Sequence, residues 1–259
     1  IVWSERIPDP RWSHSGKSLI RIYNTDTQQK VEIEPEFKSF SLALSRNRDK
    51  IVVVETDFSN NYFLSVYSVP GGELLYRYQT PQNNYFFSPR WLDDQKVVAV
   101  TLAEDGKRMV IVDFENEELE VLLQKDLGDV KHLRLSGNYL YFISSYSGKN
   151  SLYRLNLKNK IVEQVFEPRF GVEHPAITED GKKIVLSDYT AHGYQLIQIS
   201  STNKKIVPLD KIQPANYKLA DALAKQEVGI PDFSGTDSIT YESKKYSKPA
   251  HLMNFHSWA

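Results

Sequence analysis

The feature that most constrains the fold is a strand-like segment that returns every 43 to 45 residues along the chain. Each copy is a short apolar run that ends in small polar and turn residues. A period near 44 with strand character is typical of a β-propeller, in which each repeat forms one four-stranded blade. The five copies centre on Ile22, Val66, Ile111, Arg154 and Ile197.

A second sequence pattern repeats at nearly the same spacing along the chain. It is a β-branched or aromatic run, and four of its copies follow a turn rich in Asp, Asn or Gly, which tolerate the conformations of tight hairpins. The runs begin at residues 1, 51, 97, 140 and 184. The alternative is a β-sandwich, but a sandwich has no reason to repeat strand by strand, so the two signals favour the propeller.

The repeats also predict the strand order within each blade, from an inner strand a at the central channel to an outer strand d at the rim. The β-branched run is strand b and the most regular copy is strand c. We expect strand a at 40–44, 85–91, 130–135 and 173–177, and strand d at 30–33, 74–78, 119–123, 161–166 and 205–209. The prediction is therefore an all-β fold of about five blades over residues 1–212. The first blade is incomplete, and we expect the segment to be a piece of a longer protein.

Residues 213–259 do not repeat. Apolar residues at helical spacing predict a helix over 215–228, followed by a linker toward a downstream domain. His251 and His256 near the end are five residues apart, which is no recognised metal-ligand motif, so no metal site is predicted there.

Composition excludes several classes of function. The chain has 259 residues and a net charge of −1, so no basic field attracts nucleic acid. It has no apolar run near the roughly 20 residues of a membrane-spanning helix. Cysteine is absent, which excludes disulfides and thiolate chemistry. No Gly-x-Ser-x-Gly motif or phosphate-binding glycine loop occurs, and we expect neither a cofactor nor a metal.

Loops from b to c and from d to the next a share one face of a propeller, where ligands usually dock. The first b–c loop, expected at Glu5–Ser18, is the longest and carries Arg and Trp, two residue types that dominate binding hot spots. The alternative is that Trp12 only caps the blade core and that Arg11 pairs with Asp9. Two histidines at the starts of inner strands could bind a metal, although a structural role is the favoured interpretation. The candidate ligand-binding residues are Arg6, Asp9, Arg11, Trp12, His14, Tyr85, His132, Arg169, His174 and His192.

The segment Ala176–Ser187 resembles the TolB-type propeller repeat, in which an Asp-Gly-Lys turn precedes an apolar strand. Leu42–Ile51 and Arg90–Val97 are degenerate copies of it. The resemblance covers about residues 1–209 and implies a TolB-like propeller. Such propellers occur as periplasmic interaction modules and as non-catalytic domains of tricorn-type and prolyl-oligopeptidase-type proteases.

A narrower resemblance rests on Asp9–Ser13 together with Ile20–Tyr23, and on Ala250–Trp258. These segments look like the propeller region of large bacterial envelope proteins that carry an outer-membrane barrel. The resemblance implies a location in the periplasm or cell envelope, with any membrane contact made through a domain outside this chain.

Three functions fit the sequence. The first is a non-catalytic scaffold that binds a protein, peptide or polymer on its loop face. The second is a substrate-gating propeller of a protease or other hydrolase. The third, a glycan-cleaving propeller enzyme, ranks last because it requires converging acidic residues on the inner strands, where mainly Glu173 is found.

Overall fold

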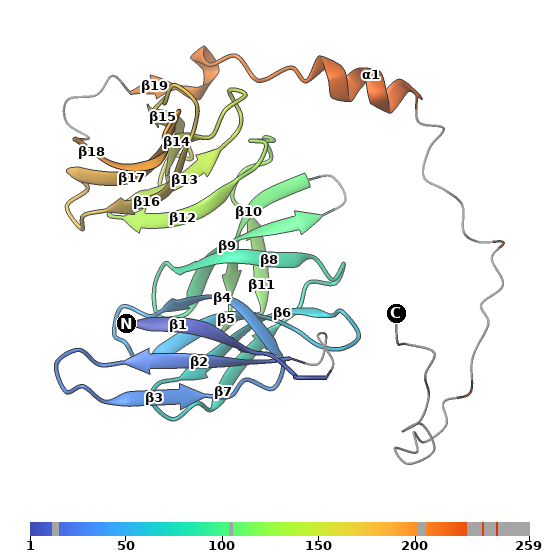
Figure 1. Ribbon diagram of the computed structural model, residues 1–259, viewed down its shortest axis with the longest axis vertical. Coiled ribbons are helices and arrows are strands. Elements are labelled where there is room, and N and C mark those ends of the chain that lie inside the picture. The colour runs from blue at the N-terminus through green and yellow to red at the C-terminus, as the bar shows by residue number, and fades with distance from the viewer. Residues whose placement is uncertain (12–15, 104–105, 201–205, 227–234, 236–241, 243–259) are drawn as a thin grey trace, which may run out of the picture. The chain divides into compact units, whose positions relative to one another are not determined.

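A computed structural model describes residues 1–11, 16–103, 106–200, 206–226, 235 and 242. The chain divides into a compact unit, Ile1–Asn216, and a second unit, Tyr217–Ala259. The first unit contains five separate antiparallel sheets that follow one another along the chain (Figure 1). The fold is an all-β propeller of five blades, as the repeat predicts.

The blades differ in their number of strands. Blade 1 contains β1 (Val2–Ile7), β2 (Lys17–Tyr23) and β3 (Lys30–Ile33). Blade 2 contains β4 (Lys38–Leu44), β5 (Lys50–Thr56), β6 (Tyr62–Ser68) and β7 (Leu74–Tyr78). Blade 3 contains β8 (Tyr85–Trp91), β9 (Lys96–Ala103), β10 (Gly106–Asp113) and β11 (Glu118–Val121). Blade 4 contains β12 (Lys131–Ser136), β13 (Tyr139–Ser144), β14 (Ser151–Asn156), β15 (Val162–Phe166) and β19 (Val207–Pro208). Blade 5 contains β16 (Val172–Ile177), β17 (Lys183–Thr190) and β18 (Gly193–Ser200).

The b strands of blades 2, 3 and 4 are buried on both faces because a neighbouring blade covers each face. In β5, Val52 and Val54 pack with blade 3, whereas Ile51 and Val53 pack with blade 1. All four side chains are fully buried. This double burial explains why the predicted b strands read as continuous apolar runs rather than as alternating ones.

The inner strands of blades 2 to 5 contact one another in chain order: β4 with β8, β8 with β12, and β12 with β16. The four predicted a strands are therefore correctly placed. Each of them contains a register shift against its b strand, which marks a β-bulge. The first residue inside each shift is Phe40, Ser88, His132 or His174. Bulges turn side chains away from the regular alternation of a strand, so these four positions are equivalent sites, one on each of blades 2 to 5.

The prediction for the outer strand of blade 5 was wrong. Residues 205–209 were expected beside β18, but β19 pairs with β15 at the edge of blade 4. The segment returns to blade 4 because Leu209, only 7% exposed, packs in that blade's core, and the N–H of Ala215 donates to the Tyr146 carbonyl at 2.7 Å. Blade 5 consequently presents Tyr194 and Leu196 of β18 to solvent.

In the second unit, α1 (Lys218–Gln226) confirms a helix, which begins at Lys218 rather than at the expected residue 215, while residues 227 and 228 lie outside the described part of the chain. Its apolar residues Leu219 and Leu223 are exposed. His251 and His256 lie outside the described residues. Among the helices that are described, none is long and apolar enough to cross a membrane.

Candidate functional site

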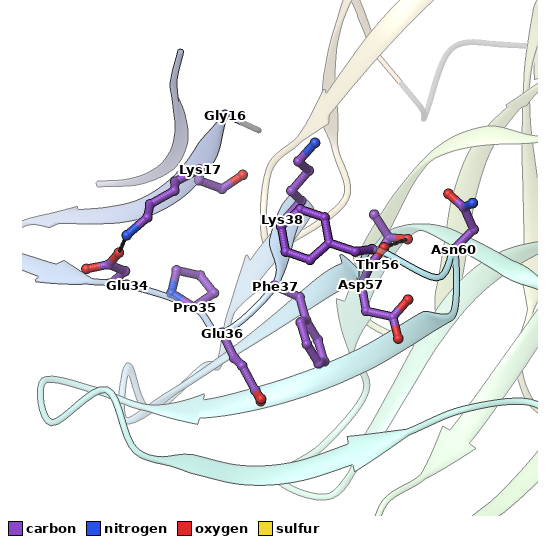
Figure 2. Close-up of a pocket in the computed structure, with 12 residues that line it drawn as sticks. Gly16, Lys17, Glu34, Pro35, Glu36, Phe37, Lys38, Thr56, Asp57 and Asn60 are labelled. Carbon is purple, nitrogen blue, oxygen red and sulfur yellow. Dashed lines mark hydrogen bonds and ion pairs between the residues drawn. The ribbon is translucent and has the colours of Figure 1, made fainter. Parts of the chain in front are cut away.

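The loops that join b to c and d to the next a form one face of the propeller, which we call the loop face. A pocket of about 380 Å³ opens there between blades 1 and 2. The β3–β4 loop supplies Glu36 and Phe37 to its wall, and Lys17 forms a 2.7 Å ion pair with Glu34 beside it (Figure 2). Phe58, which is 85% exposed, also borders the pocket. The pocket thus combines apolar and charged groups.

A partly buried charge network supports this wall of the pocket. Arg77 donates to Glu36 at 2.7 Å and to Glu55 at 3.3 Å, and its guanidinium lies 4.5 Å from the ring centre of Phe37. Glu55 is fully buried and also accepts a 2.6 Å hydrogen bond from Tyr67. Burial and the neighbouring Glu55 raise the pKa of Tyr67, so the phenol stays protonated and donates.

A second network lies where β12 and β16 begin, on the inner side of blades 4 and 5. Glu173 Oε1 accepts hydrogen bonds from Lys131 at 2.8 Å and from Asn150 at 2.7 Å. Lys131 also lies 3.6 Å from Asp129, which pairs with Lys107. Opposite charges on adjacent inner strands therefore hold the loop ends of blades 3, 4 and 5 together.

The two bulge histidines lie against this network. Their ring centres are 4.3 Å apart, and His132 Nε2 is 3.1 Å from Glu173 Oε2. Burial lowers the pKa of His132 to about 4, and the nearby His174 adds to the effect, although Glu173 acts in the opposite direction. His132 is therefore neutral at pH 7. Glu173 Oε2 is buried and, apart from the nearby His132 Nε2, has no hydrogen-bond donor in the described part of the chain.

The inner strands of blades 2 and 3 carry aromatic residues instead. The ring of Tyr85 lies 5.1 Å from Tyr62, 6.0 Å from Phe87 and 6.4 Å from Phe40. Phe40, at the bulge of β4, is 45% exposed. The loop end of the inner surface thus has an aromatic half on blades 2 and 3 and a charged half on blades 4 and 5.

The structure brings together three of the predicted site residues, Tyr85, His132 and His174, on consecutive inner strands β8, β12 and β16. Arg6 lies near the pocket between blades 1 and 2. Gly16 lines that pocket, and a Cβ atom added at Gly16 would lie 3.6 Å from Arg6 Nε. Arg6 is within β1, which continues to Ile7, so the expected loop boundary at Glu5 was wrong.

The remaining predicted residues lie apart from the inner strands. The Arg11 N–H donates to Asp9 Oδ1 at 2.8 Å within the β1–β2 loop. Arg169, in the β15–β16 loop, stacks on Phe170 at 5.0 Å. His192 is exposed in the β17–β18 turn. Trp12 and His14 lie outside the described residues.

No metal centre is formed by the part of the chain that the structure describes, where no group of three His, Asp or Glu side chains is arranged to hold an ion. The described histidines, His132, His174 and His192, make no hydrogen bond to a serine hydroxyl. The site offers hydrogen bonding, charge and aromatic contact.

Sequence reasoning missed Phe40, Phe87, Lys107 and Lys131, as well as two arginines, Arg90 and Arg134. The signal that could have found them is the repeat itself. Lys131 and Glu173 are 42 residues apart, and Arg90 and Arg134 are 44 apart, so each pair occupies one blade position twice. A charged residue in the middle of an inner strand, repeated at the blade period, is unusual enough to mark a site.

No known protein family and no curated protein matches the sequence. Solved structures match the fold. TolB from Acinetobacter baumannii is similar with a TM-score of 0.61 and 17% identity, over 83% of this chain and 53% of that protein. A putative TolB from Agrobacterium tumefaciens gives 0.59 and 13%, over 81% of this chain and 80% of that one. A puromycin-hydrolysing peptidase from Mycobacterium tuberculosis gives 0.55 and 13%, over 80% of this chain and 35% of the peptidase.

These matches show that the chain has a TolB-like β-propeller fold. The chain spans about half the length of the A. baumannii protein, at 53%. The likeness to envelope proteins with an outer-membrane barrel stays a prediction.

Proposed function

We propose that this chain is a non-catalytic propeller scaffold in a bacterial cell-envelope protein. It binds a protein, peptide or polymer on its loop face, with the binding surface at the loop ends of the inner strands. The proposed location is the periplasm.

The observation that carries this proposal is the division of the inner surface into two halves. A folded or extended peptide presents apolar side chains and polar backbone groups together, and the aromatic half and the charged half complement these two features. The charged half offers Lys131, Glu173 and the neutral His132 as polar groups, while Tyr85 and Phe40 offer flat apolar surfaces.

The bulges support the same proposal. Ser88, His132 and His174 have φ values of 52°, 56° and 51°, in the left-handed region that residues other than glycine rarely adopt. Three inner strands therefore keep a costly backbone conformation at one equivalent position. Such conformations cluster at ligand-binding sites, where they direct side chains toward the ligand.

Photo-crosslinking in the periplasm tests the proposal. A photoreactive phenylalanine derivative replaces Phe40 on the inner strand β4, and a matched control replaces Leu75 on the outer strand β7, which is similarly exposed at 41% against 45%. We expect a discrete adduct from position 40 and none from position 75. Equal labelling from both positions, or no adduct from position 40, would contradict a binding surface at the inner strands.

A second candidate is a substrate-gating propeller of a protease or other hydrolase, favoured by the fold similarity to the mycobacterial peptidase. This function requires a catalytic segment in the same reading frame or in a tightly bound partner. A full-length reading frame with a hydrolase segment supports it, and deletion of the propeller should then broaden the range of substrate lengths that are cleaved. A reading frame and a purified complex that both lack such a segment would remove this candidate.

A further inference from the structure

Two arginines occupy the same position on neighbouring inner strands. Arg90 on β8 and Arg134 on β12 are each the first residue after the bulge, and each pairs with its b strand immediately beyond the register shift. Because β8 contacts β12, equivalent positions on these strands lie side by side. The equivalent positions on β4 and β16 hold Leu42 and Ala176, so this pair of like charges belongs to blades 3 and 4 alone.

Neither guanidinium has a carboxylate partner within the described chain. Arg90 donates only to the Pro89 carbonyl at 2.6 Å, and Arg134 donates only to the Leu133 carbonyl at 2.9 Å. A guanidinium carries several N–H donors in a planar fork, so most donors of both side chains remain available. Both residues are half-buried, which makes the missing counter-charge costly.

Other half-buried arginines of the same propeller have carboxylate partners. Arg77 pairs with Glu36 and Glu55, and Arg154 forms a 2.7 Å ion pair with Glu163. In both, burial opposes the charge, but hydrogen bonds to the carboxylates prevail and raise the pKa of the arginine. By contrast, burial lowers the pKa of Arg90 to about 10, with the charge of Arg134 adding to the effect, and burial lowers the pKa of Arg134 as well. The charge of Arg134 thus disfavours the charge of Arg90.

We propose that Arg90 and Arg134 form an oxyanion-binding site in which both guanidiniums hold one carboxylate of an acidic peptide segment. The proposal deepens the proposed function, since it rests on a peptide bound along the inner strands. A carboxylate shared between two guanidinium forks supplies the missing counter-charge and receives several charge-assisted hydrogen bonds.

A peptide is the ligand that the surroundings favour over a free anion. The aromatic residues Tyr85 and Phe87 precede Arg90 on β8, and His132 and Lys131 precede Arg134 on β12. A chain that enters from the loop face therefore passes aromatic and hydrogen-bonding groups before it reaches the arginines. A free phosphate uses only the arginines and gains nothing from these contacts.

The test compares two labelled peptides by fluorescence anisotropy: Phe-Gly-Glu-Glu-Gly-Phe amide and the same peptide with Gln in place of Glu. We expect the acidic peptide to bind the wild-type chain at least about tenfold more tightly than the Gln peptide. Equal binding of the two peptides overturns the inference without any change to the protein. Titration with inorganic phosphate separates the ligand classes, because a phosphate-induced rise in melting temperature without peptide binding also overturns it.

The Arg90→Gln/Arg134→Gln variant provides the second arm. It should lose about tenfold or more in affinity for the acidic peptide, whereas the control Arg46→Gln, an exposed arginine on the opposite face, should bind like wild type. Because the double variant removes two charges without partners, its melting temperature should equal or exceed that of the wild type. If cross-linking from position 40 persists while the double variant binds the acidic peptide normally, the proposed function stands and this inference fails.

Discussion

Replacement of Arg77 by methionine should destabilise the propeller strongly, because it leaves a buried carboxylate without its partner. Glu55 is fully buried, and its charge is matched by Arg77 at 3.3 Å. Removal of one member of a buried ion pair costs about 3–5 kcal/mol. The cation–π contact of Arg77 with Phe37, at 4.5 Å, adds about 0.5–1 kcal/mol. Methionine retains most of the apolar stem, so the loss reflects the charge. We expect the free energy of unfolding to fall by about 4 kcal/mol.

Urea unfolding followed by tryptophan fluorescence and circular dichroism measures this change. The control is Arg46→Met, which breaks an ion pair with Glu179 whose side chains are 88% and 89% exposed. Exposed pairs contribute little, so this variant should lose less than about 0.5 kcal/mol. The double variant Glu55→Gln/Arg77→Met removes both charges and should recover about 1–3 kcal/mol relative to the sum of the single changes.

Two results would refute this reasoning. A loss below about 1 kcal/mol in Arg77→Met would mean that water or a neighbouring donor compensates Glu55 as well as Arg77 does. Strict additivity in the double variant would mean that the two charges do not act as a pair. Either result would also remove the explanation of how Glu36 and Phe37 are held at the wall of the first pocket.

Two further predictions follow from the inner strands and from blade 4. The pKa of His132 is about 4 in the folded state and 6.5 ordinarily, so the unfolded state binds more protons between these values and stability falls as the pH drops from 6.5 to 4. The loss is at most about 3 kcal/mol, and His132→Gln should flatten this part of a pH–stability curve measured in urea. Leu209→Ala should cost about 2–4 kcal/mol, because Leu209 fastens the returning segment into the core of blade 4. A cost below about 0.5 kcal/mol would place that segment outside the cooperative fold.

The sequence predicted the blades well because their middle strands obey a strict requirement. A strand between two blades is apolar on both faces, and Ile51–Val54 and Val97–Val100 satisfy this requirement in register with the repeat. Turn residues then fix the hairpins between these runs. Strand order and the inner position of the a strands follow from the same period.

The position of β19 could not be read from the same pattern. Residues 205–209 keep the alternation of an outer strand, but Pro208 lacks an N–H and fits any sheet edge. The outer edges of β15 and β18 are both available to it. The choice of β15 depends on Leu209 and Ile212, which pack with blade 4. This contact joins residues distant along the chain, and local periodicity does not encode it.

The candidate site was only partly predictable for a related reason. Tyr85, His132 and His174 were predicted because an aromatic residue or a histidine is a candidate binding residue by its type alone. Arg90 and Arg134 were missed because neither residue is unusual by itself. Only the fold shows that they lie on adjacent strands and that neither has a carboxylate partner in the described chain. The bulges, which fix these relations, have no sequence signature here, since their first residue is Phe, Ser or His.

The equivalence of the bulge positions explains how one backbone can serve different ligands. The inner strands β4, β8, β12 and β16 each have two equivalent positions, one at the bulge and one just before it. The side chains at these positions differ from blade to blade. Here the place before the bulge holds Phe87 on β8, Lys131 on β12 and Glu173 on β16. Exchange of these side chains changes what can be bound and leaves the apolar core of the b and c strands in place, while exchange of Lys131 or Glu173 also breaks their ion pair. The apolar core therefore lies mainly on the b and c strands, and Arg90→Gln, which removes a guanidinium without an ion-pair partner in the described chain, should alter ligand affinity and leave the unfolding free energy unchanged or higher.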